Sequence, residues 1–163
     1  MASYLFAEIE GAAPALTAEG WHMPGSLTKA SGAWIHAAGT AAFSAGSYPI
    51  TSHEQWVWFA VEAGEVVLHW EENELPLKAN DTCFLPAGEK SAHLEVSDQA
   101  HCVWVALEGP LAPMVVRKMG ALLHMPLRQG ALPSQMYLAK QIVQVMVRHT
   151  GTADATYQLQ HLM

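Results

Sequence analysis

Hydrophobic residues gather in short runs through the first two thirds of the chain. The runs are four to seven residues long, which is strand length, and Gly, Pro, Asn and Asp fall between them. Short strands at regular spacing are typical of an all-β sandwich or barrel. The predicted strands are Ala33–Ala38, Thr40–Ala45, Trp56–Glu62, Glu65–Glu71, Glu74–Lys78, Thr82–Leu85, His93–Val96 and Cys102–Leu107.

Turn-forming residues separate these runs. Asn80 suits a tight turn into a strand, because Asn tolerates positive φ angles. The runs 66–70 and 75–77 flank a polar stretch of four residues, which predicts a β-hairpin with its tip in water. The turn signals are Gly39, Gly46, Ala63-Gly64, Glu72-Asn73, Asn80-Asp81, Pro86-Ala87-Gly88 and Ser97-Asp98.

The last third of the chain changes to a helical period. Ser134 is an N-cap candidate, and apolar residues then recur at three- and four-residue spacing. The recurring residues are Met136, Ala139, Ile142, Val143 and Met146. This predicts a helix over residues 134–149, which Gly151 closes, and a shorter helix near 111–123. A further helix pattern begins near Asp154 and has no closing signal at Met163, so we expect the chain to continue into a longer protein.

Composition excludes several classes of protein. Hydrophobic residues make up 51% of the 163 residues and charged residues 14%, against about 25% charged in average globular domains, which excludes intrinsic disorder. No apolar run approaches the roughly 18 residues of a membrane span, and the N-terminus lacks the basic region of a signal peptide. The two cysteines are therefore expected to be reduced thiols in a cytoplasmic protein.

Charge is unevenly distributed between the two halves. Residues 1–109 hold three basic and fourteen acidic residues, whereas residues 110–163 hold five basic and one acidic residue. The net charge is −7, which argues against direct binding of nucleic acid by this chain. We therefore expect two segments: a β-barrel with an N-terminal arm over 1–109, and a helical dimerisation or linker segment over 110–163.

Several segments of the β half follow one another in a recognisable order. A strand that begins near His53 leads to the turn at Gly64, and residues 77–88 then carry Asn-Asp, the run Thr82–Leu85 and Pro-Ala-Gly. His93 lies five residues further on, and a Val-Trp-Val strand at 103–105 ends in Gly109-Pro110. This order resembles the cupin pattern, and specifically the N-terminal sensing domain of AraC-type transcription regulators. The likeness is good over residues 50–163 and loose over 20–50.

The resemblance implies a mainly-β fold: a cupin-like β-barrel (double-stranded β-helix, or jelly roll) followed by C-terminal α-helices. A small barrel of this kind has room for side chains or for one small ligand. Metal-dependent cupins carry ligands at four positions, which correspond here to Thr51, His53, Val57 and Ser91. Only His53 keeps a ligand type, so we expect no metal and no other cofactor, although recruits such as His69 leave a residual site open.

The candidate pocket residues follow from the same resemblance. It places an aromatic pocket residue at Trp104, and His93 is expected on the strand face of His53. Each histidine in or beside a strand can equally be a hydrogen-bonded wall residue. Trp56 and Trp58 share a face that we expect to lie opposite His53, under the N-terminal arm or the helices. The predicted ligand-binding residues are His36, His53, His93, Cys102 and Trp104; Cys83 is expected to be a buried small hydrophobe.

The function that these observations favour is the effector-sensing and dimerisation domain of an AraC-type transcription regulator, and not an enzyme. A small, neutral, partly apolar molecule is expected in the barrel, DNA is expected to be bound only by a C-terminal domain outside these residues, and no membrane partner is expected. Two alternatives remain: a free-standing cupin metalloenzyme, such as an oxygenase or isomerase, and a metabolite-binding module without signalling.

A homodimer is expected through the 134–149 helix. This helix is apolar around most of its circumference, whereas a helix that covers its own barrel needs only one apolar stripe. The face near Leu138, Ile142 and Val145 would then remain for a partner, and closed two-fold dimers are the commonest oligomers.

Overall fold

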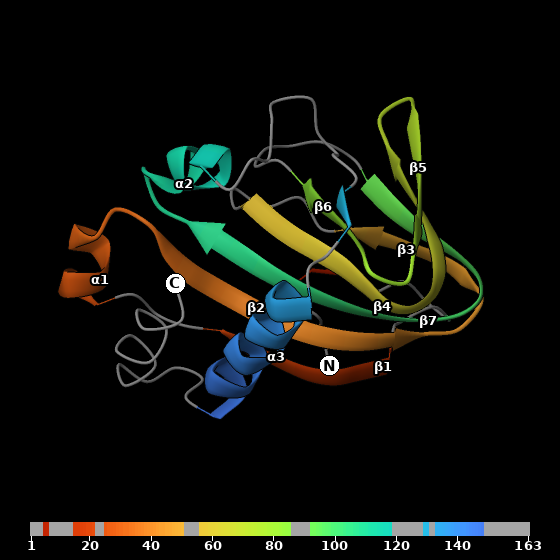
Figure 1. Ribbon diagram of the computed structural model, residues 1–163, viewed down its shortest axis with the longest axis horizontal. Coiled ribbons are helices and arrows are strands. Elements are labelled where there is room, and N and C mark those ends of the chain that lie inside the picture. Colours follow the sequence, from red (N-terminus) through yellow and green to blue (C-terminus); the bar gives the residue numbers. More distant parts are fainter. Residues whose placement is uncertain are drawn as a thin grey trace.

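The computed structural model describes residues 5–6, 15–21, 25–50, 56–85, 92–118, 129–130 and 133–148 (Figure 1). Antiparallel strands dominate it, and the helices lie outside the curved sheet. The elements in chain order are β1 (Ala15–Trp21), α1 (Ser26–Ala30), β2 (Trp34–Phe43), β3 (Gly46–Ile50), β4 (Trp56–Trp70), β5 (Asn73–Lys78), β6 (Asp81–Leu85), β7 (Ala92–Glu108), α2 (Ala112–Lys118), β8 (Gln129–Gly130) and α3 (Pro133–Arg148).

Two long strands, β4 and β7, organise the sheet. The strand order is β1-β2-β7-β4-β6-β8, with β3 added to β7 and β5 added to β4. The C-terminal half of β7 pairs with β2, and its N-terminal half pairs with β3. In the same way β4 pairs first with β6 and then with β5. Because both long strands serve two sets of neighbours, the sheet curls on itself, and the predicted β-barrel followed by helices is confirmed.

Two predicted turns lie inside these long strands. Ala63-Gly64 forms part of a β-bulge region of β4 rather than a turn, since the register shifts twice between Val61 and Val66 while pairing with β7 continues. Ser97-Asp98 is an exposed stretch of β7. The four strands predicted over 56–71 and 93–107 are therefore two strands. A bulge preserves the ladder while it adds twist, and local sequence does not distinguish it from a turn.

Gly39 was also predicted as a turn, and it lies within β2. A Cβ atom at this position would lie 2.3 Å from Cζ2 of Trp104. Glycine is present here because the indole ring packs directly on the backbone. Strands β1 and β3 and helix α1 were not predicted.

Other local predictions are confirmed. The β4–β5 hairpin turns at Glu71 and Glu72, and Asn80 has a φ of 72° at the turn into β6. Helix α3 matches the helix predicted over 134–149, and Pro133 occupies its first position, where a missing N–H costs nothing. Helix α2 is the helix predicted near 111–123. Within the described ranges, no helix combines the length and hydrophobicity needed to cross a bilayer.

Side chains on the inner face of the barrel form one core, which we call the lumen cluster. It draws on β2 to β7 and on the N-terminal residues Leu5 and Phe6. Its members are Leu5, Phe6, Ala37, Ala41, Phe43, Tyr48, Val57, Phe59, Val61, Val66, Leu68, Leu77, Cys83, Leu85, Leu94, Val96, Ala100, Cys102, Trp104 and Ala106.

A second core, the helix-side cluster, lies between the outer face of the sheet and the helices. Helix α3 contacts β1, β2 and β7 and crosses β1 and β2 in Figure 1. Trp58 belongs to this cluster and Trp56 packs against it, so the prediction that these tryptophans lie on the helix side is confirmed. The members are Ile35, Ala38, Trp58, Ala60, Trp70, Phe84, Val103, Val105, Leu107, Ala112, Val116, Ala139, Ile142, Val143 and Met146.

Candidate ligand-binding site

Alternation along β7 decides which candidate residues can reach the lumen. Leu94, Cys102 and Trp104 belong to the lumen cluster, and so do the other buried even-numbered residues of the strand. The odd-numbered Val103 and Val105 lie in the helix-side cluster. The two faces of a strand alternate strictly, so Cys102 and Trp104 face the lumen together.

Trp104 belongs to the lumen cluster. Its side chain is fully buried, and its ring meets the ring of Phe6 edge-on at a centroid distance of 5.6 Å. The ring also packs against the backbone of Gly39. The indole Nε1 is buried and has no hydrogen-bond partner among the residues that the structure describes. Such an orphaned donor is uncommon in a folded protein and costs free energy until a partner accepts it.

The N-terminal segment fills the space beside Trp104. Leu5 and Phe6 are both buried, and a bridge between Phe6 and Ile50 ties the segment to the end of β3. The Phe6 ring also meets Phe43 edge-on at 5.0 Å, and Phe43 meets Tyr48 at 4.9 Å. Rings placed edge-to-face in this way are attracted to one another. The lumen is therefore closed by side chains of its own chain.

The remaining polar atoms of the lumen cluster are weak or already engaged. The Tyr48 hydroxyl donates to the Ser44 carbonyl oxygen at 2.8 Å and lies 3.3 Å from the Ser44 hydroxyl. Burial raises the pKa of the Cys83 thiol to about 12 and also raises that of Cys102, so both are neutral thiols near pH 7. The prediction that Cys83 is a buried small side chain is confirmed.

His93 does not face the lumen, which corrects its prediction as a pocket residue beside Trp104. It is an odd-numbered residue of β7 and therefore points outward. Its ring stacks on that of His69 from β4, with centroids 4.4 Å apart and an interplanar angle of 5°. This pair could not be predicted from the sequence, because the register between β4 and β7 brings the two histidines together.

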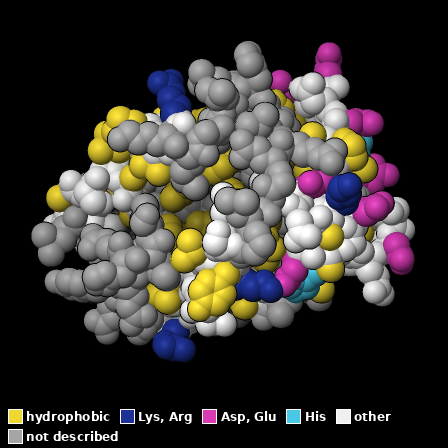
Figure 2. All heavy atoms as spheres, in the orientation of Figure 1, with side chains coloured by type: hydrophobic (Ala, Val, Ile, Leu, Met, Phe, Trp, Pro, Cys, Tyr) yellow, Lys and Arg dark blue, Asp and Glu magenta, His cyan; other side chains and the backbone are white. Residues whose placement is uncertain are grey.

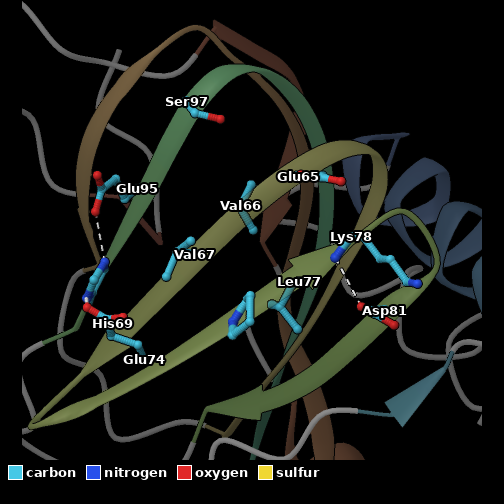
Figure 3. Close-up of a pocket in the computed structure, with 11 residues that line it drawn as sticks. Glu65, Val66, Val67, His69, Glu74, Leu77, Lys78, Asp81, Glu95 and Ser97 are labelled. Atoms are coloured by element: carbon cyan, nitrogen blue, oxygen red, sulfur yellow. Dashed lines mark hydrogen bonds and ion pairs between the residues drawn. The ribbon is translucent and has the colours of Figure 1, made fainter.

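An outer groove of about 420 Å³ lies over β4, β5 and β7, next to this histidine pair (Figure 3). His69 Nε2 lies 2.9 Å from Glu95 Oε2, and its Nδ1 lies 3.6 Å from Glu74 Oε1. Figure 2 shows acidic side chains gathered at this end of the molecule, where Figure 1 places β5. The carboxylates of Glu74 and Glu95 are largely exposed, and the residues that the structure describes include no group of three or more metal-ligating side chains.

His36 lies at one end of the barrel. It is the extra residue of a bulge in β2, between Ile35 and Ala37. Its Nδ1 is 3.0 Å from Glu108 Oε2, and the same carboxylate oxygen accepts a hydrogen bond from Trp34 Nε1 at 3.0 Å. His36 is thus a rim residue held by Glu108. The lumen cluster contains neither of them.

The family's metal positions are described only in part. Val57 is buried in the lumen cluster, whereas Thr51, His53 and Ser91 lie outside the described residues. No metal ligand can come from the aliphatic side chain of Val57. His53 as a ligand-binding residue stays a prediction.

The three residues predicted for dimerisation differ in exposure. Ile142 is only 9% exposed and packs in the helix-side cluster of its own chain, which corrects the expectation of a free face there. Val145 is partly buried against the same cluster, and Leu138 is 39% exposed. Ala139, Val143 and Met146 lie on the side of the helix that faces the sheet. Ile142 packs in the same cluster.

One polar network was missed from the sequence. Glu62 on β4 pairs with Lys140 on α3 and with His101 Nδ1 on β7 at 2.7 Å. Burial by itself raises the pKa of the Glu62 carboxyl, but the hydrogen bonds and positive charges of Lys140 and His101 outweigh it and lower the pKa. The network ties α3 to the bulge of β4. Only tertiary structure brings residues so distant in sequence together.

Solved structures resemble this fold. The protein YhaK from Escherichia coli aligns with a TM-score of 0.51 at 14% identity, over 75% of this chain and 52% of that one. A putative ethanolamine utilization protein Q from Salmonella typhimurium LT2 aligns at 0.44 and 22% identity, over 64% and 78%. A cupin superfamily protein from Desulfitobacterium hafniense DCB-2 aligns at 0.41 and 13%, over 46% and 74%.

Among curated protein sequences, none matches this chain. The family model of the AraC-like ligand binding domain matches residues 36–162, which is most of the chain. That range includes the long strands β4 and β7, the lumen residues Cys102 and Trp104, and helix α3. The chain therefore belongs to the family of AraC-like ligand binding domains.

Proposed function

We propose that this chain is the effector-sensing and dimerisation domain of an AraC-type transcription regulator and that it binds a small molecule in the barrel lumen. The observation that carries the proposal is the fully buried indole of Trp104, whose N–H lacks a partner in a lumen closed by its own chain. A ligand that accepts this hydrogen bond would stabilise the domain.

The test of this site is a metabolite screen by thermal unfolding. A ligand at 100 times its Kd adds about 2.7 kcal/mol to the free energy of unfolding. We expect the stabilisation by a true hit to fall at least severalfold in Trp104→Phe. It should persist in Trp56→Phe, because Trp56 packs on the helix side. Hits that are indifferent to Trp104→Phe would place the ligand elsewhere and overturn the lumen site.

A metal-dependent enzyme is not favoured as an alternative. Val57 supplies an aliphatic side chain at one of the family's metal positions, and the two buried thiols of the lumen are held neutral by burial. Elemental analysis of protein purified without chelator is expected to find no stoichiometric transition metal. A finding of one metal ion per chain that is lost in His53→Ala would support the metalloenzyme alternative.

Dimerisation is proposed through the outward side of α3. Tyr137, Leu138 and Val147 are exposed there, whereas Ile142 packs inward. We expect light scattering to give a dimer at micromolar concentration and Leu138→Glu to give a monomer. Asn73→Asp is the control, since it adds the same charge at an exposed position of β5, away from α3 (Figure 1). A wild-type chain that stays monomeric would remove the proposal.

The regulator's contact with DNA is proposed to require a separate module. Residues 1–109 carry a large excess of acidic over basic residues, which repels phosphate. A gel-shift series at moderate salt should show no sequence-specific binding of duplex DNA by the 163-residue chain.

A further inference from the structure

The polar atoms that face the lumen define what kind of molecule can be held there. An indole N–H donates a hydrogen bond and cannot accept one, and the Trp104 N–H is buried without a partner. Two buried free thiols, Cys83 and Cys102, also belong to the lumen cluster. Thiols are weak donors and weak acceptors. Among the described residues of this cluster, the Trp104 N–H is thus the strong donor that a ligand can use.

The groups that contact the Trp104 ring in the lumen are apolar: Phe6 meets it edge-on, and the Gly39 backbone lies against it. Asp81 is a buried carboxylate on the face of β6 that Cys83 shares, and its Oδ2 already accepts the Lys78 N–H at 3.0 Å. A buried carboxylate or ammonium on a ligand needs a paired and hydrogen-bonded partner to offset the loss of hydration. The raised pKa of each lumen thiol keeps it from serving as that partner for a cation near pH 7. An uncharged ligand avoids this cost.

Sugars are disfavoured by the same count of polar atoms. A buried sugar needs a hydrogen-bond partner for most of its hydroxyl groups, because each unpaired hydroxyl costs free energy. In the part of the lumen wall that the structure describes, the Tyr48 hydroxyl already bonds to Ser44, and the Asp81 carboxylate already accepts the Lys78 N–H.

Phe6 indicates the shape of the occupant. Its ring lies edge-on to both Trp104 and Phe43, with centroids 5.6 Å and 5.0 Å away. A bridge to Ile50 connects its backbone to the end of β3. A ligand in the lumen competes with this side chain for the same aromatic walls.

We propose that the lumen ligand is an uncharged, largely apolar ring compound with one hydrogen-bond acceptor, of the aromatic ketone, ester or lactone class. Its oxygen accepts a hydrogen bond from the Trp104 N–H, and its ring replaces that of Phe6. This inference rests on the proposed function, because it specifies the effector of the same barrel site.

The experiment titrates the whole chain with three probes and follows the indole N–H signals by ¹H–¹⁵N NMR. Acetophenone carries a ring and a carbonyl oxygen, isopropylbenzene has a methyl group in place of that oxygen, and D-glucose represents a neutral sugar. We expect acetophenone to move the Trp104 N–H proton downfield, isopropylbenzene to bind without that shift, and D-glucose not to bind. The Trp104 signal is assigned as the one missing from Trp104→Phe.

Variants separate the hydrogen bond from simple hydrophobic binding. Trp104→Phe removes the N–H, and it should lower the affinity for acetophenone relative to isopropylbenzene by about threefold to tenfold. Phe6→Ala should raise the affinity for both aromatic probes, since it removes the competing ring. Phe84→Ala is the matched control, because Phe84 is also buried but belongs to the helix-side cluster, and it should leave both affinities unchanged.

The outcomes distinguish this inference from the proposed function. If no probe binds either the wild-type chain or Phe6→Ala, the ligand class is wrong, and the metabolite screen with Trp104→Phe decides the sensing site. If D-glucose binds and perturbs the Trp104 signal, or if acetophenone binds without the downfield shift, the ligand class is wrong and the sensing site stands. Should a variant fail to fold, the wild-type titration decides alone, since the downfield shift with acetophenone and its absence with isopropylbenzene need no substitution.

Discussion

The inner and outer faces of β7 are both apolar, but different parts of the chain cover them. On the inner face, the ring of Trp104 meets that of Phe6, which lies next to buried Leu5. On the outer face lies α3, a helix of sixteen residues that contacts β1, β2 and β7. A ligand that replaces one side chain at Trp104 disturbs less of the structure than a ligand that displaces a whole helix.

Polar atoms reinforce this contrast. At the border of the outer face, Glu62 pairs with both His101 and Lys140 and so ties the helix to the barrel. In the lumen, the N–H of Trp104 has no such partner. Paired polar groups hold a structure in place, whereas an unpaired buried donor is a cost that a ligand can remove. Under the proposed function, a ligand can therefore stabilise the inner face, whereas the border of the outer face already has its polar groups paired.

The largest expected effect tests how well the inner face is packed. Trp104→Ala leaves a cavity at a fully buried position, so the free energy of unfolding should fall by about 3–5 kcal/mol. Urea unfolding measures this loss. Trp21→Ala serves as the control, because Trp21 is 45% exposed, and it should cost less than about 1 kcal/mol. Equal small losses in both variants would mean that Trp104 does not anchor the lumen.

Local patterns in the sequence predicted the architecture but not the junctions between strands. The apolar run at 56–62 and the positive φ of Asn80 are local properties, and both are confirmed. Gly39 and Gly64 have the same local appearance as a turn. The first makes room for Trp104, and the second, with a φ of 82°, lies where a Cβ atom would approach the Gln99 carbonyl oxygen to 2.2 Å. Those causes are contacts between strands, which one sequence does not display.

The same difference between local patterns and contacts between strands explains which candidate site residues were predicted correctly. The family resemblance predicted Trp104 as a lumen residue. Cys102 lies two residues earlier on the same strand, so alternation places it on the same face. The prediction for His93 was wrong. It assumed that His93 shares the face of the metal positions of other cupins, but the odd-numbered residues of β7 point outward. Phe6 could not be predicted as a lumen residue, because no pattern in the sequence around it indicates that Leu5 and Phe6 pack against Trp104.

The second effect tests how the outer face is closed. Ile142→Ala removes a side chain that packs in the helix-side cluster, so the chain should lose about 2–4 kcal/mol of unfolding free energy. Leu138→Ala, on the same helix but 39% exposed, should cost less than about 1 kcal/mol. Both are measured by urea unfolding at low protein concentration. If Leu138 proved the costlier of the two, the helix would face the sheet with its other side.

A third, smaller effect tests the distance between α3 and the sheet. A Cβ atom at Gly20 of β1 would lie 2.3 Å from the backbone carbonyl carbon of Met146, so Gly20→Ala must push the helix away. We expect a loss of about 1–3 kcal/mol by the same measurement. Gly25→Ala is the matched control, since no atom lies within 4 Å of its Cβ position, and it should stay within about 1 kcal/mol of wild type. Equal unfolding free energies of the two variants would mean that α3 does not pack against Gly20 of β1.

The smallest effect concerns the polar tie at the border of the outer face. Glu62→Gln removes the negative charge that faces Lys140 and His101, and near pH 7 it should cost about 0.2–1 kcal/mol. The folded state holds the pKa of Glu62 below its ordinary value, so the unfolded chain binds the proton first as the pH falls. The stabilisation is therefore complete above the unfolded pKa of about 4.3 and disappears as the pH falls through the lower, folded pKa.

Unfolding in urea near pH 7 and near pH 3 measures this tie. The difference between wild type and Glu62→Gln should shrink at the lower pH, because protonation removes the same charge from the wild-type chain. Glu65→Gln provides the control: Glu65 is an exposed carboxylate further along β4, and its substitution should change stability little at either pH. A difference that persisted unchanged near pH 3 would mean that the Glu62 side chain acts through its packing. The ion pairs of Glu62 would then not be what stabilises the border of the outer face.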